Sequence, residues 1–264
     1  MNTGKQIRFN SIFRRSTGNT VCVAIDHGGI AGPMEGINDP RQLIQDCVDG
    51  GADTVLTTRG FARAAGDAWD RRCSLILRLT GGFTVLGGKF EEELISTPSA
   101  ALLYGASGAA VTVKFGHERE GEFTKQASLV ADDCERWGMP LMIEAMARGK
   151  DMKKDDPTGV AQAARFAAEI GADIVKTYYT GDPDSFAKVV EGCPVPVVIL
   201  GGAKMESLED VFSTVFNSMQ AGAKGVAIGR NIWQHKDTKR MIEAMAGVVH
   251  ESWSVSQALK HVGE

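Results

Sequence analysis

The stretch GADIVKT (171–177) starts with a glycine suited to ending a helix and continues into an apolar, β-branched run. The same Gly-Ala step stands before apolar runs at 51–52, 108–109 and 222–223. A glycine just past the last helical residue is a common helix end, so each copy predicts a helix that turns into a strand. The repeat indicates that helices and strands alternate along the chain.

Eight short runs have the continuous apolar composition of strands that are buried on both faces. They are VCVAID (21–26), DTVLTT (53–58), SLILRL (74–79), AAVTVK (109–114), PLMIEA (140–145), DIVKT (173–177), PVVIL (196–200) and GVAIG (225–229). Helical segments lie between them, among them 40–50, 98–106, 122–137, 158–170, 205–221 and 237–249. Eight alternating units of about 33 residues predict a parallel (β/α)8 barrel. A doubly wound open sheet is the rival arrangement, but it rarely needs eight units.

We therefore expect a single TIM-barrel domain over residues 1–264, with a short N-terminal lead-in (1–20) and a C-terminal helical extension (250–264). The pairs Asp39-Pro40, Thr97-Pro98 and Asp156-Pro157 are typical helix starts. The segment 241–262 carries apolar residues at helical spacing beyond what the eighth helix needs. We expect it to pack across the bottom of the barrel or against a neighbouring subunit.

The composition excludes several classes of protein. With 29 basic and 33 acidic residues and a net charge of −4, the chain lacks the basic character of a nucleic-acid binder. No apolar run approaches the roughly 20 residues of a membrane span, and the N-terminus has no apolar core typical of a secretory signal. The five cysteines form no C-x-x-C pair, which is typical of reduced thiols in a cytoplasmic protein. No metal or other cofactor is expected, because the chain has no H-E-x-x-H motif, carboxylate triad or histidine cluster.

In a TIM barrel the active site lies at the C-terminal ends of the strands and in the loops that follow them. Polar residues and glycines stand at several of these predicted ends. They are Asp26-His27-Gly28, Arg59-Gly60, Lys114, Glu144 to Arg148, Lys176 to Tyr179, Gly201-Gly202 and Gly229-Arg230.

Lys176 is the candidate nucleophile. Burial in an apolar strand disfavours a charged ammonium, and a partly neutral lysine can form a Schiff base with a ketone or aldehyde. Lys114, at the end of the fourth strand, is expected to supply a second positive charge that favours the neutral form further. The alternative is a lysine that extends its ammonium to water.

Two glycine turns indicate a phosphate site. Gly201, Gly202 and Ala203 follow the seventh strand, and Gly229 and Arg230 follow the eighth. Glycines let backbone N–H groups approach an anion closely, and these two loops are the usual phosphate site of the fold. The alternative is that the glycines only form tight turns.

Four further side chains are candidates for proton transfer or substrate binding. Asp26 and His27 close the first strand, where Asp26 acts on the substrate or merely caps the loop. Glu144, at the end of the fifth strand, is expected within reach of Lys176 across the barrel, and is either a proton carrier or an ion-pair partner of Lys114. Of Tyr178 and the adjacent Tyr179, one is expected to offer its phenol to the site and the other to pack.

Together these stretches resemble the class I, Schiff-base aldolases of the archaeal-type fructose-bisphosphate aldolase family. The resemblance runs from about residue 12 to about residue 250 and rests on AIDHGGIAGPMEGI (24–37), TTRG (57–60), GADIVKTYY (171–179), PVPVVILGGAK (194–204) and GRNIWQ (229–234). Two related groups share these marks: the aminodideoxyheptulosonate synthases and the thiolase that breaks down phosphorylated autoinducer-2.

The resemblance implies roles for particular residues. Lys176 is then the Schiff-base lysine, Asp26 and His27 line the substrate site, and Gly202, Gly229 and Arg230 bind phosphate. A homo-oligomer is also implied, with a decamer as one form, because the related enzymes form rings of five that stack in pairs.

One position departs from the family pattern. The sugar-bisphosphate aldolases carry an acid/base tyrosine followed by Pro-Arg-Gly, and here Met146 stands in its place, before Ala147 and Arg148. A methionine cannot transfer a proton, so Glu144 or a tyrosine takes that role, or the substrate is not fructose bisphosphate. The main prediction is cleavage or formation of a C–C bond in a phosphorylated keto sugar. Acetyl transfer to coenzyme A, a transaldolase-like synthase, an isomerase and a phosphosugar sensor are the alternatives.

Overall fold

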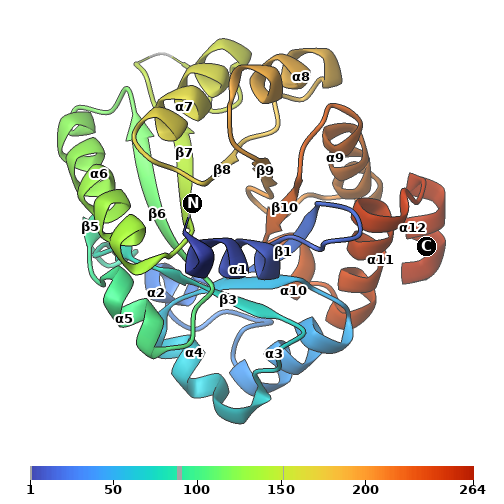
Figure 1. The fold of residues 1–264 in the computed structure, drawn as a ribbon. Coiled ribbons are helices and arrows are strands. Elements are labelled where there is room, and N and C mark those ends of the chain that lie inside the picture. Colours follow the sequence, from blue (N-terminus) through green and yellow to red (C-terminus); the bar gives the residue numbers. More distant parts are fainter. Residues whose placement is uncertain (1, 88–90, 151) are drawn as a thin grey trace.

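The computed structural model describes residues 2–87, 91–150 and 152–264. Eight parallel strands close into a barrel in the order β1-β10-β9-β8-β7-β6-β3-β2 (Figure 1). Their bounds are β1 Thr20–Ala24, β2 Thr54–Thr57, β3 Ser74–Arg78, β6 Gly108–Phe115, β7 Leu141–Ala147, β8 Ile174–Thr177, β9 Val197–Leu200 and β10 Gly225–Ile228. Each predicted apolar run is one of these strands, so the predicted TIM barrel is confirmed.

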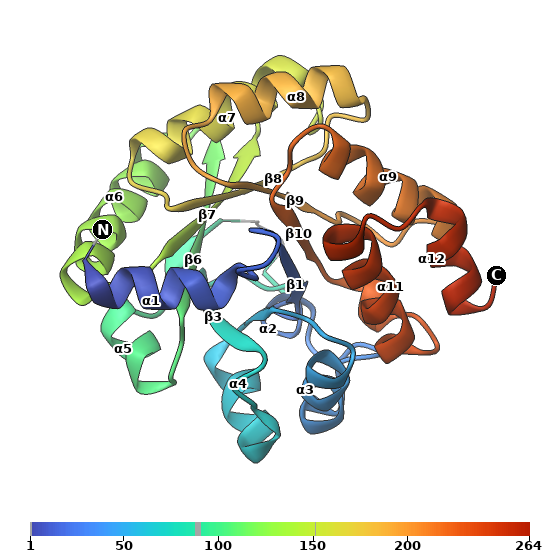
Figure 2. The same ribbon diagram turned by 45° about the vertical axis from the view of Figure 1, so that its right-hand side comes forward.

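Helices surround the barrel on its outside (Figures 1 and 2). They are α3 Pro40–Asp49, α4 Arg59–Ala65, α5 Pro98–Leu103, α6 Glu120–Trp137, α7 Pro157–Glu169, α8 Pro183–Gly192, α9 Leu208–Gln220 and α11 Thr238–Glu251. The three predicted helix starts are correct, because the side chains of Asp39, Thr97 and Asp156 each accept a hydrogen bond from a backbone N–H of the first turn. Two short helices, α2 Gly28–Ala31 and α10 Arg230–Trp233, lie in the loops after β1 and β10.

The Gly-Ala repeat ends helices at three of its four copies. Gly51, Gly171 and Gly222 have positive φ, the backbone conformation that favours glycine at a helix end. The fourth copy was misread, since Gly108 is the first residue of β6 and Gly105 has the positive φ after α5. A Cβ at Gly108 would lie 3.1 Å from the Ile12 side chain, so close packing favours glycine there.

The two chain ends pack differently from expectation. The N-terminal helix α1 (Thr3–Ile12) lies across one end of the barrel, where buried Ile12 and Phe13 join the inward-facing apolar side chains (Figure 2). The C-terminal helix α12 (Val255–Val262) packs on the outside against α9 and α11. The end that the C-terminal segment was expected to cover is therefore closed by α1.

The inside of the barrel changes from apolar to polar along its axis. Side chains alternate between the two faces of a strand, so every second residue points inward. Near α1 the inward residues are apolar, such as Cys22, Ile76, Met142 and Ile174. Two positions further along the same strands stand Arg78, Glu144 and Lys176, and Asp26 follows just beyond the end of β1; all four line a cavity. A small antiparallel pair, β4 (Thr80–Gly81) and β5 (Glu93–Leu94), follows β3 at this end.

Candidate active site

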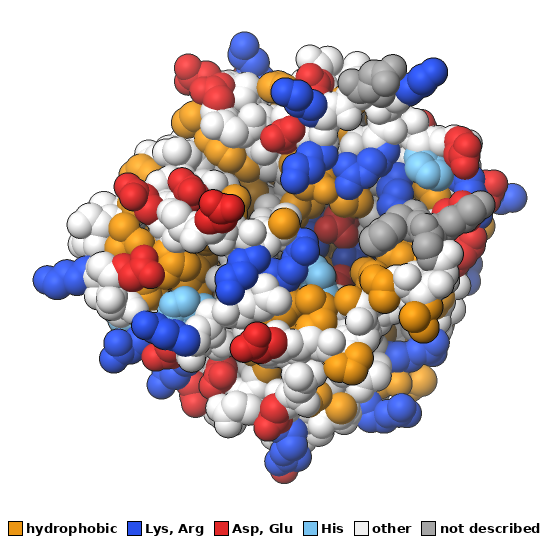
Figure 3. Space-filling view, turned by 180° about the vertical axis from the view of Figure 1, so that it is seen from behind, with side chains coloured by type: hydrophobic (Ala, Val, Ile, Leu, Met, Phe, Trp, Pro, Cys, Tyr) orange, Lys and Arg blue, Asp and Glu red, His pale blue; other side chains and the backbone are white. Residues whose placement is uncertain are grey.

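A cavity of about 790 Å³ opens at the C-terminal ends of the strands, opposite α1. In Figure 3 acidic, basic and histidine side chains gather around a hollow at this end of the molecule. The cavity is lined by residues from or just after all eight strands, including Asp26, Thr58, Arg78, Thr112, Lys176 and Arg230. The closed barrel thereby brings together residues as far apart in the sequence as Ala24 and Arg230.

Lys176 and Glu144 form an ion pair at the centre of this cavity. Lys176 Nζ lies 2.7 Å from Glu144 Oε1, and the lysine is only 4% exposed. Burial alone would raise the pKa of Glu144, but the positive charges of Lys176 and Arg78 lower it to about 2. Glu144 is therefore ionised at neutral pH and lies within hydrogen-bond distance of the candidate nucleophile.

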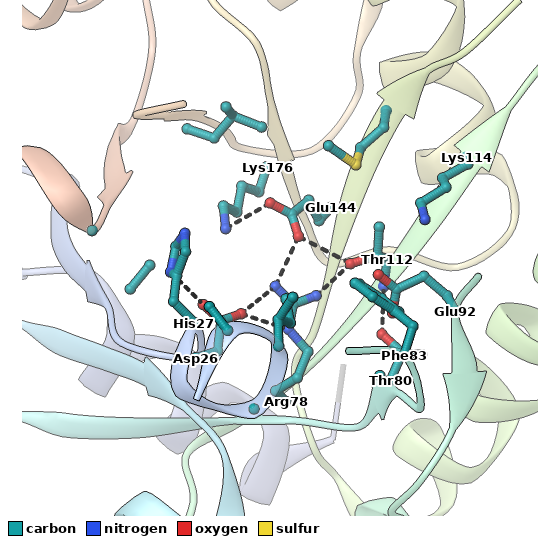
Figure 4. Close-up of a pocket in the computed structure, with 18 of the residues that line it drawn as sticks. Asp26, His27, Arg78, Thr80, Phe83, Glu92, Thr112, Lys114, Glu144 and Lys176 are labelled. Atoms are coloured by element: carbon teal, nitrogen blue, oxygen red, sulfur yellow. Dashed lines mark hydrogen bonds and ion pairs between the residues drawn. The ribbon is translucent and has the colours of Figure 1, made fainter. Parts of the chain in front are cut away.

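Arg78 joins the two carboxylates of the cavity (Figure 4). Its Nε and Nη2 donate to Asp26 Oδ2 at 2.8 and 2.6 Å, and Nη2 also donates to Glu144 Oε2 at 2.8 Å. Burial opposes ionisation of Asp26, but the charge of Arg78 holds the pKa of that carboxyl well below its usual range. Arg78 was not among the predicted site residues, although it is the last residue of β3 and lies at the strand end where such residues are expected.

His27 lies next to Asp26. Its Nδ1 is 3.5 Å from Asp26 Oδ1, and its ring meets the edge of Trp233. The indole N–H of Trp233 in turn donates to the carbonyl of Ala24 at 3.0 Å, which fixes α10 against β1. Asp26 and His27 therefore occupy the predicted place in the cavity.

We expected Lys114 to lie beside Lys176, but it does not. In Figure 4 it lies on the far side of Glu144, and its Nζ is over the Phe83 ring, 5.1 Å from the centroid. Burial lowers the pKa of Lys114, while the nearby charge of Glu92 opposes this. The ion pairs that Glu144 makes in the described chain are with Lys176 and Arg78. Of the two alternatives for Glu144, the pairing with Lys114 is therefore not the one that the structure shows.

Glu92 is a cavity carboxyl that the sequence did not reveal. It is 7% exposed, and burial raises its pKa against the opposing charges of Arg78 and Lys114. It lies in the connection between β4 and β5, outside the strand–helix repeat. The strand-end rule could therefore not find it.

The predicted phosphate turns meet at one side of the cavity. Gly201, Gly202, Gly229 and Arg230 line it, and Arg230 Nη2 donates to the Gly202 carbonyl at 2.7 Å. Within the described chain, the backbone N–H groups of Gly202 and Arg230 donate no hydrogen bond to other protein groups. Ala203 was predicted in this site but is not part of the lining. It is exposed, and its carbonyl accepts a hydrogen bond from the Asn231 amide at 3.3 Å.

The adjacent tyrosines have different surroundings. Tyr178 lines the cavity, where its hydroxyl accepts a hydrogen bond from Arg148 Nη2 at 2.9 Å. The Tyr179 ring packs on Phe186 instead, and its buried hydroxyl has no partner in the described structure. Met146 lines the cavity beside them, with its sulfur 3.8 Å from Arg148 Nη2.

No group of three histidine, cysteine, aspartate or glutamate side chains within residues 2–87, 91–150 and 152–264 is arranged to hold a metal ion. Over the same residues, no helix has the length and apolar character that crossing a membrane requires.

Residues 20–235 match the model of the DeoC/LacD family aldolases. The chain belongs to this aldolase family. Its predicted resemblance to the Schiff-base aldolases is therefore confirmed at the level of the family.

Proteins similar to this chain include enzymes with different reactions. The class 1 fructose-bisphosphate aldolase of Thermoproteus tenax is 32% identical to this chain. The match covers 96% of this chain and 97% of the Thermoproteus tenax protein. The 3-hydroxy-5-phosphonooxypentane-2,4-dione thiolase of Yersinia enterocolitica is 34% identical, over 97% of this chain and 86% of its own. A solved archaeal fructose-1,6-bisphosphate aldolase, with its catalytic lysine bound to a carbinolamine intermediate, is 33% identical with a TM-score of 0.84. It covers 93% of this chain and 99% of its own.

Proposed function

We propose that this DeoC/LacD family aldolase cleaves or forms a C–C bond in a phosphorylated keto sugar through a Schiff base on Lys176. The observation that carries the proposal is the buried Lys176–Glu144 pair, with 2.7 Å between Nζ and Oε1, at the centre of a polar cavity. A lysine beside a carboxylate has an acceptor for its ammonium proton, and the neutral amine that remains after proton transfer is the nucleophile.

The proposed reaction starts with transfer of a proton from Lys176 Nζ to Glu144. The neutral amine then attacks the ketone carbon, and the resulting hydroxyl leaves as water after it takes that proton back. The iminium that forms draws electrons from the neighbouring C–C bond, which breaks to leave an enamine. Asp26 and His27 lie on the other side of Arg78 from this pair, where they are placed to move the substrate hydroxyl proton.

The substrate phosphate is assigned to the turns at Gly201-Gly202 and Gly229-Arg230. Their backbone N–H groups and the Arg230 guanidinium supply donors for an anion. Lys114, Arg148 and Tyr178 line another part of the cavity, where they are placed to bind oxygens of the sugar. Tyr178 is also a proposed proton donor in place of the tyrosine that Met146 replaces.

Reductive trapping tests the proposal. The protein is incubated with dihydroxyacetone phosphate and cyanoborohydride, and the modified peptide is identified by mass spectrometry. We expect a reduced adduct on Lys176 that is lost in Lys176→Met and retained in Lys188→Met, which changes an outer helix. Failure to trap any of a series of phosphorylated ketoses would contradict the Schiff base and favour an isomerase or a phosphosugar sensor.

A second candidate is acetyl transfer from a phosphorylated diketone to coenzyme A. Met146 favours it, because the cavity has no tyrosine at the position where, by resemblance, the sugar-bisphosphate aldolases have their acid/base group. The two functions differ in their acceptor. Product formation that requires coenzyme A would support the transferase, and cleavage of a ketose phosphate without it would support the aldolase.

We also propose that the chain acts as one domain in a cytoplasmic homo-oligomer. All five cysteines are buried free thiols, which supports a reducing compartment. Size measurement by light scattering tests the oligomer, and a monomeric mass would contradict it.

A further inference from the structure

Each carboxylate beside Arg78 uses its two oxygens differently. Asp26 Oδ2 accepts hydrogen bonds from Arg78, and Asp26 Oδ1 lies 3.5 Å from His27 Nδ1. Glu144 Oε2 accepts a hydrogen bond from Arg78, and Glu144 Oε1 lies 2.7 Å from Lys176 Nζ. One oxygen of each acid is thus held by the guanidinium, and the other faces a group that can carry a proton.

We infer that Arg78 is a positioning residue that holds Asp26 and Glu144 as one pair of proton acceptors, each with a single oxygen directed at its proton partner. The inference rests on the proposed Schiff-base function and adds to it a residue outside the assigned machinery.

The contacts of Arg78 assign it to positioning and not to substrate binding. Besides its three bonds to the two acids, Nη1 donates to the hydroxyl of Thr112, and the side chain is 9% exposed. Thr112 also donates to Glu144 Oε2 at 3.0 Å. The planar guanidinium thus reaches three partners with fixed geometry, which a lysine ammonium on a flexible stem cannot reproduce.

The charges of the cluster balance. Lys176 and Arg78 are positive and Asp26 and Glu144 negative, and the iminium that replaces the lysine ammonium keeps the positive charge. Removing Arg78 would leave two carboxylates in a buried site with one cation, and burial penalises the ionised forms. Glu92 and Lys114 also face this cluster from the β5 side and from β6.

Arg78→Lys tests the inference through a pH profile. The rate of reductive trapping of Lys176 with dihydroxyacetone phosphate is measured between about pH 3 and pH 8, because the pKa of Glu144 in the wild-type protein is about 2. A lysine ammonium reaches only one of the two acids, so the other loses its cation and burial raises the pKa of that acid. We therefore expect the acid-side limb to lie about one pH unit or more higher in the variant. If the variant is slower at every pH but its acid-side limb does not move, Arg78 has a purely structural role and the inference is overturned.

Arg14→Lys is the matched control. Arg14 Nε donates to the buried Asp53 at 3.0 Å, near His250, at the opposite end of the barrel. This variant also weakens an arginine–aspartate pair, but it should keep the wild-type profile. An equal shift in Arg14→Lys would mean that the change is a general effect on the fold, and would contradict the inference.

Thr112→Val covers the case in which Arg78→Lys does not fold. It keeps the shape and removes the hydroxyl that aligns Arg78 with Glu144, so a smaller shift in the same direction is expected. If the acid-side limb of the folded Thr112→Val variant lies at the same pH as in wild type, the inference is overturned. If wild-type protein traps no ketose phosphate, the proposed function itself fails, which is a distinguishable result.

Discussion

Glu144 and Lys176 are register partners on the adjacent parallel strands β7 and β8, and their side chains meet inside the barrel with Nζ 2.7 Å from Oε1. Both residues belong to the hydrogen-bonded sheet and not to loops. The distance between them is therefore fixed by the sheet itself, which is the kind of support that precise catalytic geometry requires.

Replacing Glu144 should slow the formation of the Schiff base. Glu144→Gln keeps the side-chain shape but cannot take the Lys176 proton, so we expect trapping to slow by roughly 10²- to 10⁴-fold. Single-turnover trapping with dihydroxyacetone phosphate measures the rate. Glu169→Gln, which changes an exposed carboxylate on α7, is the control, and a Glu144→Gln rate within a few-fold of wild type would exclude the proton transfer.

The adjacent tyrosines should respond differently to loss of their hydroxyls. Tyr178→Phe removes the partner of Arg148 in the cavity, and we expect turnover to fall at least about tenfold. Tyr179→Phe removes a buried hydroxyl that has no partner in the described structure, so activity and stability should be unchanged or slightly improved. Steady-state kinetics and thermal unfolding of the pair measure this, and equal losses in both variants would contradict it.

Removing the Arg230 charge should weaken binding of phosphorylated substrates. A hydrogen bond to a charged group contributes about 1.5–3 kcal/mol, so Arg230→Met should raise KM roughly 10- to 150-fold. Unphosphorylated dihydroxyacetone should form its adduct as fast in this variant as in wild type. A similar loss for both ketones would mean that Arg230 does not act on the phosphate.

The ion pairs of Glu144 should make folding stability depend on pH. Burial opposes its ionisation, but Lys176 and Arg78 lower its pKa in the folded protein to about 2, below the ordinary value of 4.5. Ionised Glu144 therefore contributes stability that is fully present above about pH 4.5 and is lost as the pH falls toward 2. The loss is roughly 3 kcal/mol for this group. Urea unfolding at several pH values measures the free energy of unfolding, which should decline less below pH 4.5 in Glu144→Gln than in wild type. An equal decline in both proteins would contradict the contribution of ionised Glu144.

The sequence predicted the barrel because each strand is a run of apolar residues with a glycine or a helix end before it. The site was harder to predict. Lys176 was recognised as a charge inside an apolar strand, and Glu144 was expected within reach of it across the barrel. Their direct ion pair could not be predicted, because the two residues are 32 positions apart and meet only through strand register. Arg78 is one residue from the end of the predicted strand 74–79 and is the last residue of the observed β3, so it was within reach of the same reasoning. Glu92 was not, since no periodic pattern marks the connection between β4 and β5.

The pairing of β1 with β10 also bears on how the protein is made. Thr20 lies beside Gly225, so the first strand to leave the ribosome finds one of its two neighbours only after about 200 more residues have followed. Until then both β1 and β9 have an unpaired side, and exposed strand edges are templates for aggregation. A chain cut short before β10 would lack Arg230 as well as the closing strand. Premature termination should therefore give insoluble material and no partly active enzyme.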